Sequence, residues 1–222
     1  MILSYPSVEF LWCTKNPLEQ IEKAGRTCYK SEHKIEDGSA IKFVQMLLER
    51  GHEAMIEHAS MSYRIICDRG VTHELVRHRL FSYAQESTRF CSYKNGVEFI
   101  IPCWLYKKIR PGVYSTHFPE EYAICTDDNF FIETMMNSEK SYLILLKNGW
   151  KPQQARTVLP NALKTEIVVT GNFREWRHFF RLRCCKQAHP QMREVASLIL
   201  SDASQHIPVI FDEFLDNKEN NV

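Results

Sequence analysis

The sequence predicts an α+β fold in which helices pack around a mostly antiparallel sheet as a single compact unit. Strand-like and helical segments mix without the regular alternation that builds parallel βαβ sheets. The chain contains neither a G-x-G-x-x-G after a predicted strand nor a G-x-x-x-x-G-K-S/T, so we expect no Rossmann or P-loop site. No repeat or Pro/Gly/Ser-rich linker divides the chain, so we expect residues 1–222 to form one domain, with residues 216–222 frayed at its end.

The first half of the chain combines extended and helical patterns. Residues 1–12 predict a strand, and a proline near the first helical position starts a helix over residues 17–29. A serine cap and a closing glycine bound an amphipathic helix at residues 40–50. Residues 60–67 predict a strand that an Asp-Arg-Gly turn closes, and residues 71–79 predict a short helix after that turn.

The second half is more helical. Residues 97–104 have strand character, whereas residues 129–148 show a long helical pattern that a glycine ends. A proline starts a further helix at residues 152–159. The β-branched run within residues 163–170 favours a strand, and residues 190–206 predict the last helix.

Between these last two segments, residues 173–185 predict a helix whose faces carry different chemistry. At about 100° per residue, its aromatic side chains gather on one broad face that we expect to be buried. Arg183 projects into that face, between Trp176 and Phe179, so its guanidinium needs a carboxylate, phosphate or carbonyl partner. The partner is either a structural ion pair or a ligand in a cleft. Three other arginines form a separate stripe that we expect to be solvated: Arg174, Arg177 and Arg181.

The predicted helix at residues 71–79 ends in a basic triplet, Arg77-His78-Arg79. On a helix these side chains point in directions about 100° apart, and Arg79 falls within the apolar arc. They therefore suit an extended ligand, two ligands, or an interface with a second chain. Further hydrogen-bond donors follow in a short loop: Ser82, Gln85, Ser87, Thr88 and Arg89. Such donors beside forked guanidinium groups suit the recognition of phosphates and planar heterocycles.

Composition excludes several classes of protein. The 28 Lys and Arg residues nearly balance the 27 Asp and Glu residues, so the net charge of +1 gives no general field for nucleic acid. No apolar run approaches the roughly 20 residues of a membrane span, and the N-terminus does not resemble a secretory signal. We therefore expect a cytoplasmic protein with no nucleic-acid or membrane partner. The eight cysteines include no C-x-x-C pair, which favours reduced structural thiols, with a catalytic Cys–His pair as an open alternative.

Several motifs, taken in order, resemble those of the flavin-dependent thymidylate synthases. Arg77-His78-Arg79, followed by seven residues and then Ser87, reproduces the R-H-R-x7-S signature of that family. Residues 51–58 resemble its upstream G-H-x-x-x-x-E-H element. Further elements follow in the usual order at residues 155–160, 172–174 and 182–183. One R-H-R triplet is weak evidence, whereas five ordered elements are strong.

The resemblance implies the reductive methylation of dUMP to dTMP. Methylenetetrahydrofolate would supply the carbon, and FAD reduced by NADPH would carry the hydride. The resemblance also implies that no metal and no cysteine nucleophile is needed, and that the protein is a homotetramer whose sites combine loops from several chains. Arg183 would be the catalytic residue, facing the uracil ring and stabilising the negative charge that develops on it.

The resemblance assigns further residues to the two ligands. Those implied at FAD are His52, Ala54, Arg77, His78, Arg79, Gln85, Asn172, Phe173, Arg174 and His178. Those implied at dUMP are Glu74, Leu75, Val76, Arg77, Gln85, Glu86, Ser87, Thr88, Arg89, Arg156 and Arg183.

Two other classes of function remain as alternatives. His52 and His58, with their neighbouring glutamates, superficially resemble a metal-dependent hydrolase, but H-E-x-x-H needs histidines four residues apart and these are six apart. A nucleic-acid-binding module would rest on the basic and aromatic residues of 77–89 and 174–183, and the near-zero net charge argues against it.

Overall fold

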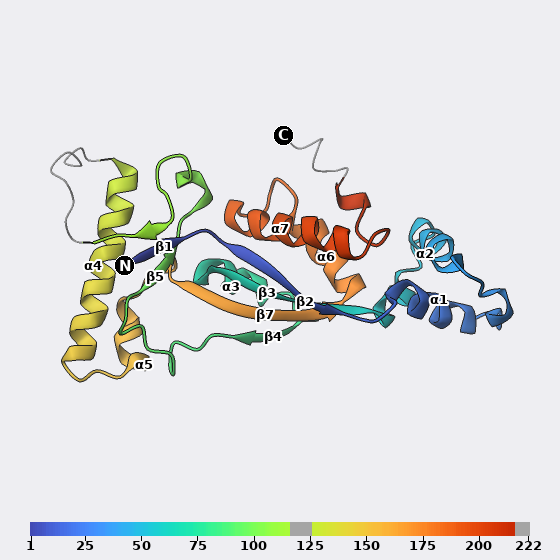
Figure 1. Cartoon of the computed structure of the whole chain (residues 1–222), viewed down its shortest axis with the longest axis horizontal. Coiled ribbons are helices and arrows are strands. Elements are labelled where there is room, and N and C mark those ends of the chain that lie inside the picture. The colour runs from blue at the N-terminus through green and yellow to red at the C-terminus, as the bar shows by residue number, and fades with distance from the viewer. Residues whose placement is uncertain (116–125, 216–222) are drawn as a thin grey trace. The chain divides into compact units, whose positions relative to one another are not determined.

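The computed structural model describes residues 1–115 and 126–215, and it has the mixed helix and sheet architecture that the sequence predicts (Figure 1). The predicted fraying of residues 216–222 lies outside the described residues. The chain divides into two compact units, each built from three stretches of sequence. Unit 1 comprises Met1–Ser7, Ile66–Glu74 and Gln85–Ile167, and unit 2 comprises Val8–Ile65, Leu75–Ala84 and Val168–Val222. That residues 1–222 form one domain stays a prediction.

Unit 1 contains a small three-stranded sheet of order β5-β1-β6. Strand β1 (Ile2–Ser4) pairs in parallel with β5 (Glu98–Ile100) and antiparallel with β6 (Gly112–Val113). The predicted strand over residues 1–12 is therefore wrong in its continuity. Pro6 interrupts it, because proline has no N–H to donate to a sheet and the chain changes sheets there.

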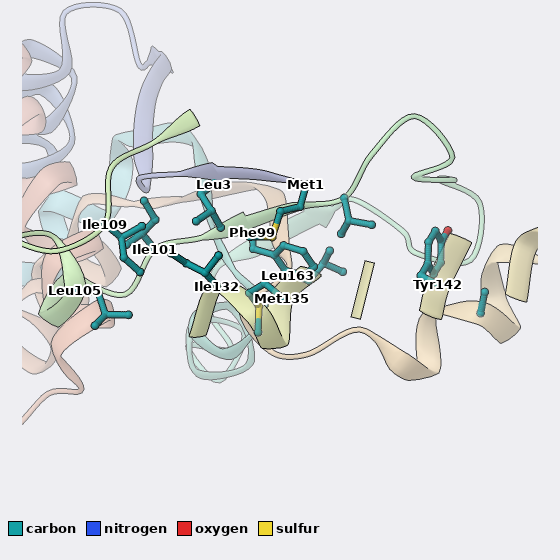
Figure 2. Packing of buried hydrophobic residues seen from close by; sticks show 12 residues of the cluster. Met1, Leu3, Phe99, Ile101, Leu105, Ile109, Ile132, Met135, Tyr142 and Leu163 are labelled. Atoms are coloured by element: carbon teal, nitrogen blue, oxygen red, sulfur yellow. The ribbon is translucent and has the colours of Figure 1, made fainter. Parts of the chain in front are cut away.

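The core of unit 1 is apolar and lies between that sheet and its helices. Leu3, Phe99 and Leu163 meet Ile132 and Met135, which lie on the long helix α4 (Asp127–Lys147) (Figure 2). Further short helical elements among the described residues of this unit include η3 (Cys103–Leu105), α5 (Pro152–Ala155) and η5 (Arg156–Val158). The predicted helix at residues 152–159 is thus one α-helical turn followed by a 3₁₀ turn.

A four-stranded sheet has the order β2-β3-β7-β4, formed by Ser7–Cys13, Ser60–Asp68, Lys164–Asn172 and Ser82–Gln85. As β3 advances, its partners run backwards along β7: the Phe173 amide donates to the Ala59 carbonyl, and the Arg69 amide to the Leu163 carbonyl. Strand β7 has strictly alternating burial. The antiparallel character of this sheet confirms the prediction, although β4 lies in a segment where the sequence indicates only a loop.

Helices and an aromatic core characterise unit 2. Its helical elements are α1 (Pro17–Thr27), η1 (Glu32–Lys34), α2 (Ser39–Glu49), η2 (Glu53–His58), α6 (Phe173–Arg183) and α7 (Pro190–His206). Trp176, Phe179 and Phe180 of α6 are fully buried and pack edge to face or tilted against one another. The broad aromatic face predicted for this helix is therefore its core face. None of the described helices is long and apolar enough to span a membrane.

Helix α3 (Arg69–Leu75) ends earlier than predicted, and this changes the geometry of the basic triplet. The chain turns after Leu75, with the His78 amide bonded to the Leu75 carbonyl at 3.1 Å. The Tyr83 hydroxyl closes the turn, lying 2.6 Å from the Leu75 carbonyl oxygen and 2.8 Å from that of His78. The helical projection of residues 77–79 is therefore wrong: Arg79 is exposed, and His78 is the buried member of the triplet.

Candidate functional site

A hollow of about 820 Å³ lies in unit 2, between the turn at residues 77–80, the element η2 and one face of α6. Its size falls within the range of roughly 300–1,000 Å³ that is usual for small-molecule sites. We call it the arginine hollow because five guanidinium groups line it: Arg77, Arg79, Arg174, Arg181 and Arg183. Three carboxylates line it as well: Glu53, Glu57 and Glu175.

His78 and Arg183 meet inside this hollow. His78 is 6% exposed, and its Nε2 accepts a hydrogen bond from Arg183 Nε at 3.0 Å. Burial, the Arg183 charge and the neighbouring His178 together lower the pKa of His78 to about 4. The imidazole is therefore neutral near pH 7, and with Nε2 accepting, its proton lies on Nδ1.

Behind His78 lies a second buried titratable group, Glu175. Glu175 Oε1 is 3.7 Å from His78 Nδ1, and the residue is 5% exposed. Burial raises the pKa of the Glu175 carboxyl. Because His78 is neutral, this contact is not an ion pair. It places a carboxylate oxygen on the side of the ring that carries the proton.

The N-terminus of α6 contributes to the hollow through Asn172 and Arg174. Asn172 is the N-cap: its side-chain oxygen accepts from the Glu175 amide at 2.9 Å. Arg174 pairs with Glu57 at 2.5 Å and lies 3.8 Å from Glu53. These ion pairs connect α6 to η2 at the edge of the hollow.

Arg177 corrects the prediction of a solvated arginine stripe on this helix. Arg177 is only 3% exposed, whereas the side chains of Arg174 and Arg181 are about half exposed. Its guanidinium pairs with Glu213 at 2.7 Å and Glu53 at 3.3 Å, and it donates to the Ile210 carbonyl. It is thus a fully partnered structural arginine, and Glu53 bridges it to Arg181 at 3.4 Å.

Unit 1 carries a smaller hollow of about 250 Å³, which we call the Arg156 hollow. Arg156 Nη1 donates to the Thr88 hydroxyl at 2.8 Å. Thr88 is 5% exposed and Arg156 is largely open to solvent. Arg69 and Asn161 also line this hollow.

The structure gathers many of the predicted residues and leaves others apart. In the arginine hollow lie Arg77, His78, Arg79, Asn172, Arg174, His178 and Arg183, and in the Arg156 hollow lie Thr88 and Arg156. Neither hollow is lined by His52, Ala54, Glu74, Leu75, Val76, Gln85, Glu86, Ser87, Arg89 or Phe173.

Some of the residues that line neither hollow have other partners. The side chains of Phe173 and Leu75 are fully buried, so only their backbones could reach a ligand. Gln85 donates to Thr72 at 3.0 Å. Glu86 accepts from the Tyr93 hydroxyl at 2.8 Å.

The motifs do not assign a role to the carboxylates of the arginine hollow. Glu53 and Glu57 lie within the G-H-x-x-x-x-E-H element, in which the sequence assigns a ligand only to His52 and Ala54. Glu175 lies three residues before His178, so the two side chains are neighbours on one face of the helix. This spacing is the signal in the sequence that points to Glu175. Arg69 was missed because Asp68-Arg69-Gly70 reads as a turn.

The donor set of the arginine hollow fits a flavin nucleotide. Guanidinium groups match phosphate oxygens in fork geometry, and their flat faces stack on planar rings. Five arginines against three carboxylates leave the lining with an excess of positive charge. Among residues 1–115 and 126–215, no group of three or more His, Cys, Asp or Glu could hold a metal ion.

Comparisons with known proteins agree on one family. Residues 9–209 match the model of the thymidylate synthase complementing protein family. A flavin-dependent thymidylate synthase of Corynebacterium efficiens is 37% identical over 203 residues, covering 87% of this chain and 78% of the relative. One from Mycolicibacterium gilvum is 35% identical over 221 residues, covering 94% and 84%.

A solved structure shares the fold. It is the UMP/dUMP methylase PolB from Streptomyces cacaoi bound with 5-Br dUMP, with a TM-score of 0.77. The sequence identity is 24%, and the match covers 97% of both chains.

Proposed function

The chain belongs to the thymidylate synthase complementing protein family, and from this membership we propose that it methylates dUMP to dTMP with a flavin. The observation that carries the proposal is the Arg183–His78 contact, which holds a guanidinium in a basic hollow next to the R-H-R signature. The relatives named flavin-dependent thymidylate synthase and the fold of the UMP/dUMP methylase support the same reaction.

The flavin in this proposal is FAD, held in the arginine hollow by Arg77, Arg79, Arg174 and Asn172. When bound, it supplies the hydride, with NADPH as its reductant and methylenetetrahydrofolate as the carbon donor. The hollow's lining arginines would neutralise the phosphates. His78 lines the same hollow and accepts a hydrogen bond from Arg183, and its contact with the flavin stays a prediction of the resemblance.

Arg183 is the residue that we assign to the uracil ring. Its His78 acceptor is neutral, so this hydrogen bond does not place a negative charge against the guanidinium. Hydrogen bonding through Nε also fixes the plane of the guanidinium. A fixed cation beside the pyrimidine stabilises negative charge that develops on the ring and so makes C5 a better nucleophile.

The nucleotide phosphate in this proposal occupies the Arg156 hollow, where Arg156 and Thr88 supply donors. We further propose a homotetramer in which a site combines residues from more than one copy of the chain. Exposed apolar side chains such as Leu80 (77% exposed), next to the R-H-R triplet, suit burial against another copy.

The direct test is product formation by the purified, flavin-loaded protein. We expect a yellow protein that converts dUMP to dTMP only when methylenetetrahydrofolate and NADPH are both present, measured by chromatography of the nucleotides. Arg183→Ala should lower turnover about 100- to 1,000-fold while flavin absorbance is retained. Arg64→Ala, which removes an exposed arginine that pairs with the exposed Glu9, is the matched control. A wild-type protein that binds neither FAD nor dUMP, or an Arg183→Ala protein with normal turnover, contradicts the proposal.

A further inference from the structure

Arg69 is a partly buried cation that lines the Arg156 hollow, and none of the motifs assigns it a role. Its Nη1 has no solvent-exposed surface and no hydrogen-bond partner among the described residues. A guanidinium nitrogen in that position has lost its hydration without regaining a hydrogen bond, which costs free energy. A buried polar group left unpaired in this way calls for an explanation, and a bound ion or ligand is one.

The backbone holds Arg69 firmly in place. Its amide donates to the Asn161 carbonyl at 2.9 Å and lies 3.1 Å from the Leu163 carbonyl oxygen. Arg69 is the first residue of α3 and directly follows β3, so both elements restrict it. The side chain therefore leaves a fixed backbone position, and its Nη1 is enclosed by protein.

The other donors of this hollow are also arranged for an acceptor. Arg156 Nη1 uses the Thr88 oxygen as acceptor, which leaves the Thr88 O–H as a donor. Like charges that line one hollow of about 250 Å³ repel each other unless an anion lies between them. Among the described residues, no carboxylate comes within ion-pairing distance of the Arg69 side chain. Glu86, a carboxylate of the same unit, accepts a hydrogen bond from the Tyr93 hydroxyl.

We propose that Arg69, Arg156 and Thr88 together bind a phosphate monoester, with Arg69 as a second guanidinium on its oxygens. Two forked guanidiniums and a hydroxyl match the charge and acceptors of a terminal phosphate. The volume is below that of a typical whole-ligand pocket, so the hollow takes the phosphoryl end of a larger molecule. That this molecule is dUMP rests on the proposed function.

The test compares ligands with and without the phosphate. Binding of dUMP and of deoxyuridine is measured by calorimetry on the flavin-loaded wild-type enzyme and on Arg69→Gln. Arg69→Gln should weaken dUMP binding about 10- to 100-fold, the usual effect of one charge-assisted contact, and leave deoxyuridine binding unchanged. Inorganic phosphate should compete with dUMP on the wild type and compete more weakly on Arg69→Gln. Arg64→Gln is the control and should match the wild type.

Each outcome decides the question. Equal weakening of dUMP and deoxyuridine, or no weakening of either, overturns the role of Arg69. If Arg69→Gln does not fold, Arg69→Lys keeps the charge but loses the fork, and it must still weaken dUMP more than deoxyuridine. If the wild-type enzyme binds inorganic phosphate through Arg69 but does not bind dUMP, the proposed function is wrong. The assignment of a phosphate site to this hollow is then still supported. FAD binding that falls with dUMP binding in Arg69→Gln assigns the hollow to the flavin phosphates and overturns the monoester.

Discussion

The charge state of His78 follows from what surrounds its ring. Arg183 donates to Nε2, His178 lies with its ring centroid 6.1 Å away, and Glu175 approaches Nδ1 at 3.7 Å. The ring also packs edge to face against Phe179. Burial and two neighbouring cationic or basic groups outweigh the single carboxylate, and the pKa of His78 falls to about 4.

This low pKa predicts a particular loss of stability in acid. The unfolded chain takes up a proton at His78 near pH 6.5, whereas the folded protein does so only near pH 4. The contribution of neutral His78 to the free energy of unfolding is therefore fully present above pH 6.5. It is lost progressively as the pH drops from 6.5 towards 4. His78→Gln, which keeps an acceptor for Arg183, should lose about 1–2 kcal/mol less stability than the wild type between pH 7 and pH 5.

Urea denaturation of both proteins at the two pH values measures this difference. His33→Gln, at an exposed histidine in η1, serves as the control and should keep the wild-type pH dependence. An identical loss in His78→Gln and wild type shows that His78 is not held neutral in the fold.

Arg177 and Arg183 mark what a helical projection can and cannot predict. The projection places Arg183 beside the aromatic face, and in the structure Arg183 is partly buried and lines the arginine hollow. It assigns Arg177 to solvent because a helical angle carries no information about distant partners. Arg177 donates to Glu213 and to the Ile210 carbonyl, which lie more than thirty residues further along the chain. These partners compensate for the cost of burying its charge.

Helix α6 begins at a residue with two assigned roles. The resemblance implies Asn172 at the flavin, and the structure uses its side-chain oxygen as the N-cap of α6. Asn172→Ala should destabilise the protein by about 1 kcal/mol through loss of the cap, whereas Asn172→Asp keeps a capping oxygen and should not. Because Asp carries a negative charge towards the flavin phosphates, Asn172→Asp should nevertheless weaken FAD binding.

Urea denaturation without FAD and fluorescence titration with FAD separate the two roles. Asn148→Ala is a suitable control, because Asn148 is exposed at the C-terminal end of α4, has an ordinary φ of -79° and caps no helix N-terminus. If Asn172→Asp binds FAD as the wild type does, Asn172 is a cap and nothing more. If Asn172→Ala is as stable as the wild type, the cap bond does not contribute.

The bounds of the helices and strands were predictable where local chemistry sets them. The helix predicted over residues 190–206 matches α7 at both ends, since a proline fixes its start. The end of α3 was not predictable, because the Tyr83 hydroxyl, eight residues beyond Leu75, stabilises the turn that replaces the last helical turn. Ser39 is the first residue of α2 and not its cap, since Gly38 adopts the left-handed conformation before it.

Charge is distributed unevenly over the chain although its net value is only +1. The arginines of residues 77–89 and 156–183 contribute most of the lining cations of both hollows, as the sequence indicates. Their carboxylate partners were not predictable, since Glu53, Glu57 and Glu213 lie far from α6 in sequence. Both hollows therefore carry an excess of positive charge that anionic ligands can use.

The proposed sharing of sites between copies makes a prediction for mixed oligomers. Arg183 belongs to the arginine hollow and Arg156 to the Arg156 hollow, so Arg183→Ala and Arg156→Ala should each be nearly inactive alone. If a site takes Arg183 from one copy and Arg156 from another, a mixed oligomer contains sites in which both arginines are intact. Random assortment of equal amounts should restore activity in roughly a quarter of the sites.

Co-expression of the two variants with different affinity tags, followed by tandem purification, isolates the mixed oligomers for a dTMP assay. Light scattering should give a mass of about four times 26.1 kDa, as expected for a homotetramer. Arg183→Ala co-expressed with Arg183→Gln is the matched control, because no arrangement of these chains supplies the missing guanidinium. Mixed oligomers of Arg183→Ala and Arg156→Ala that stay as inactive as this control mean that each copy uses its own two arginines, since only a site drawn from two copies can recover both.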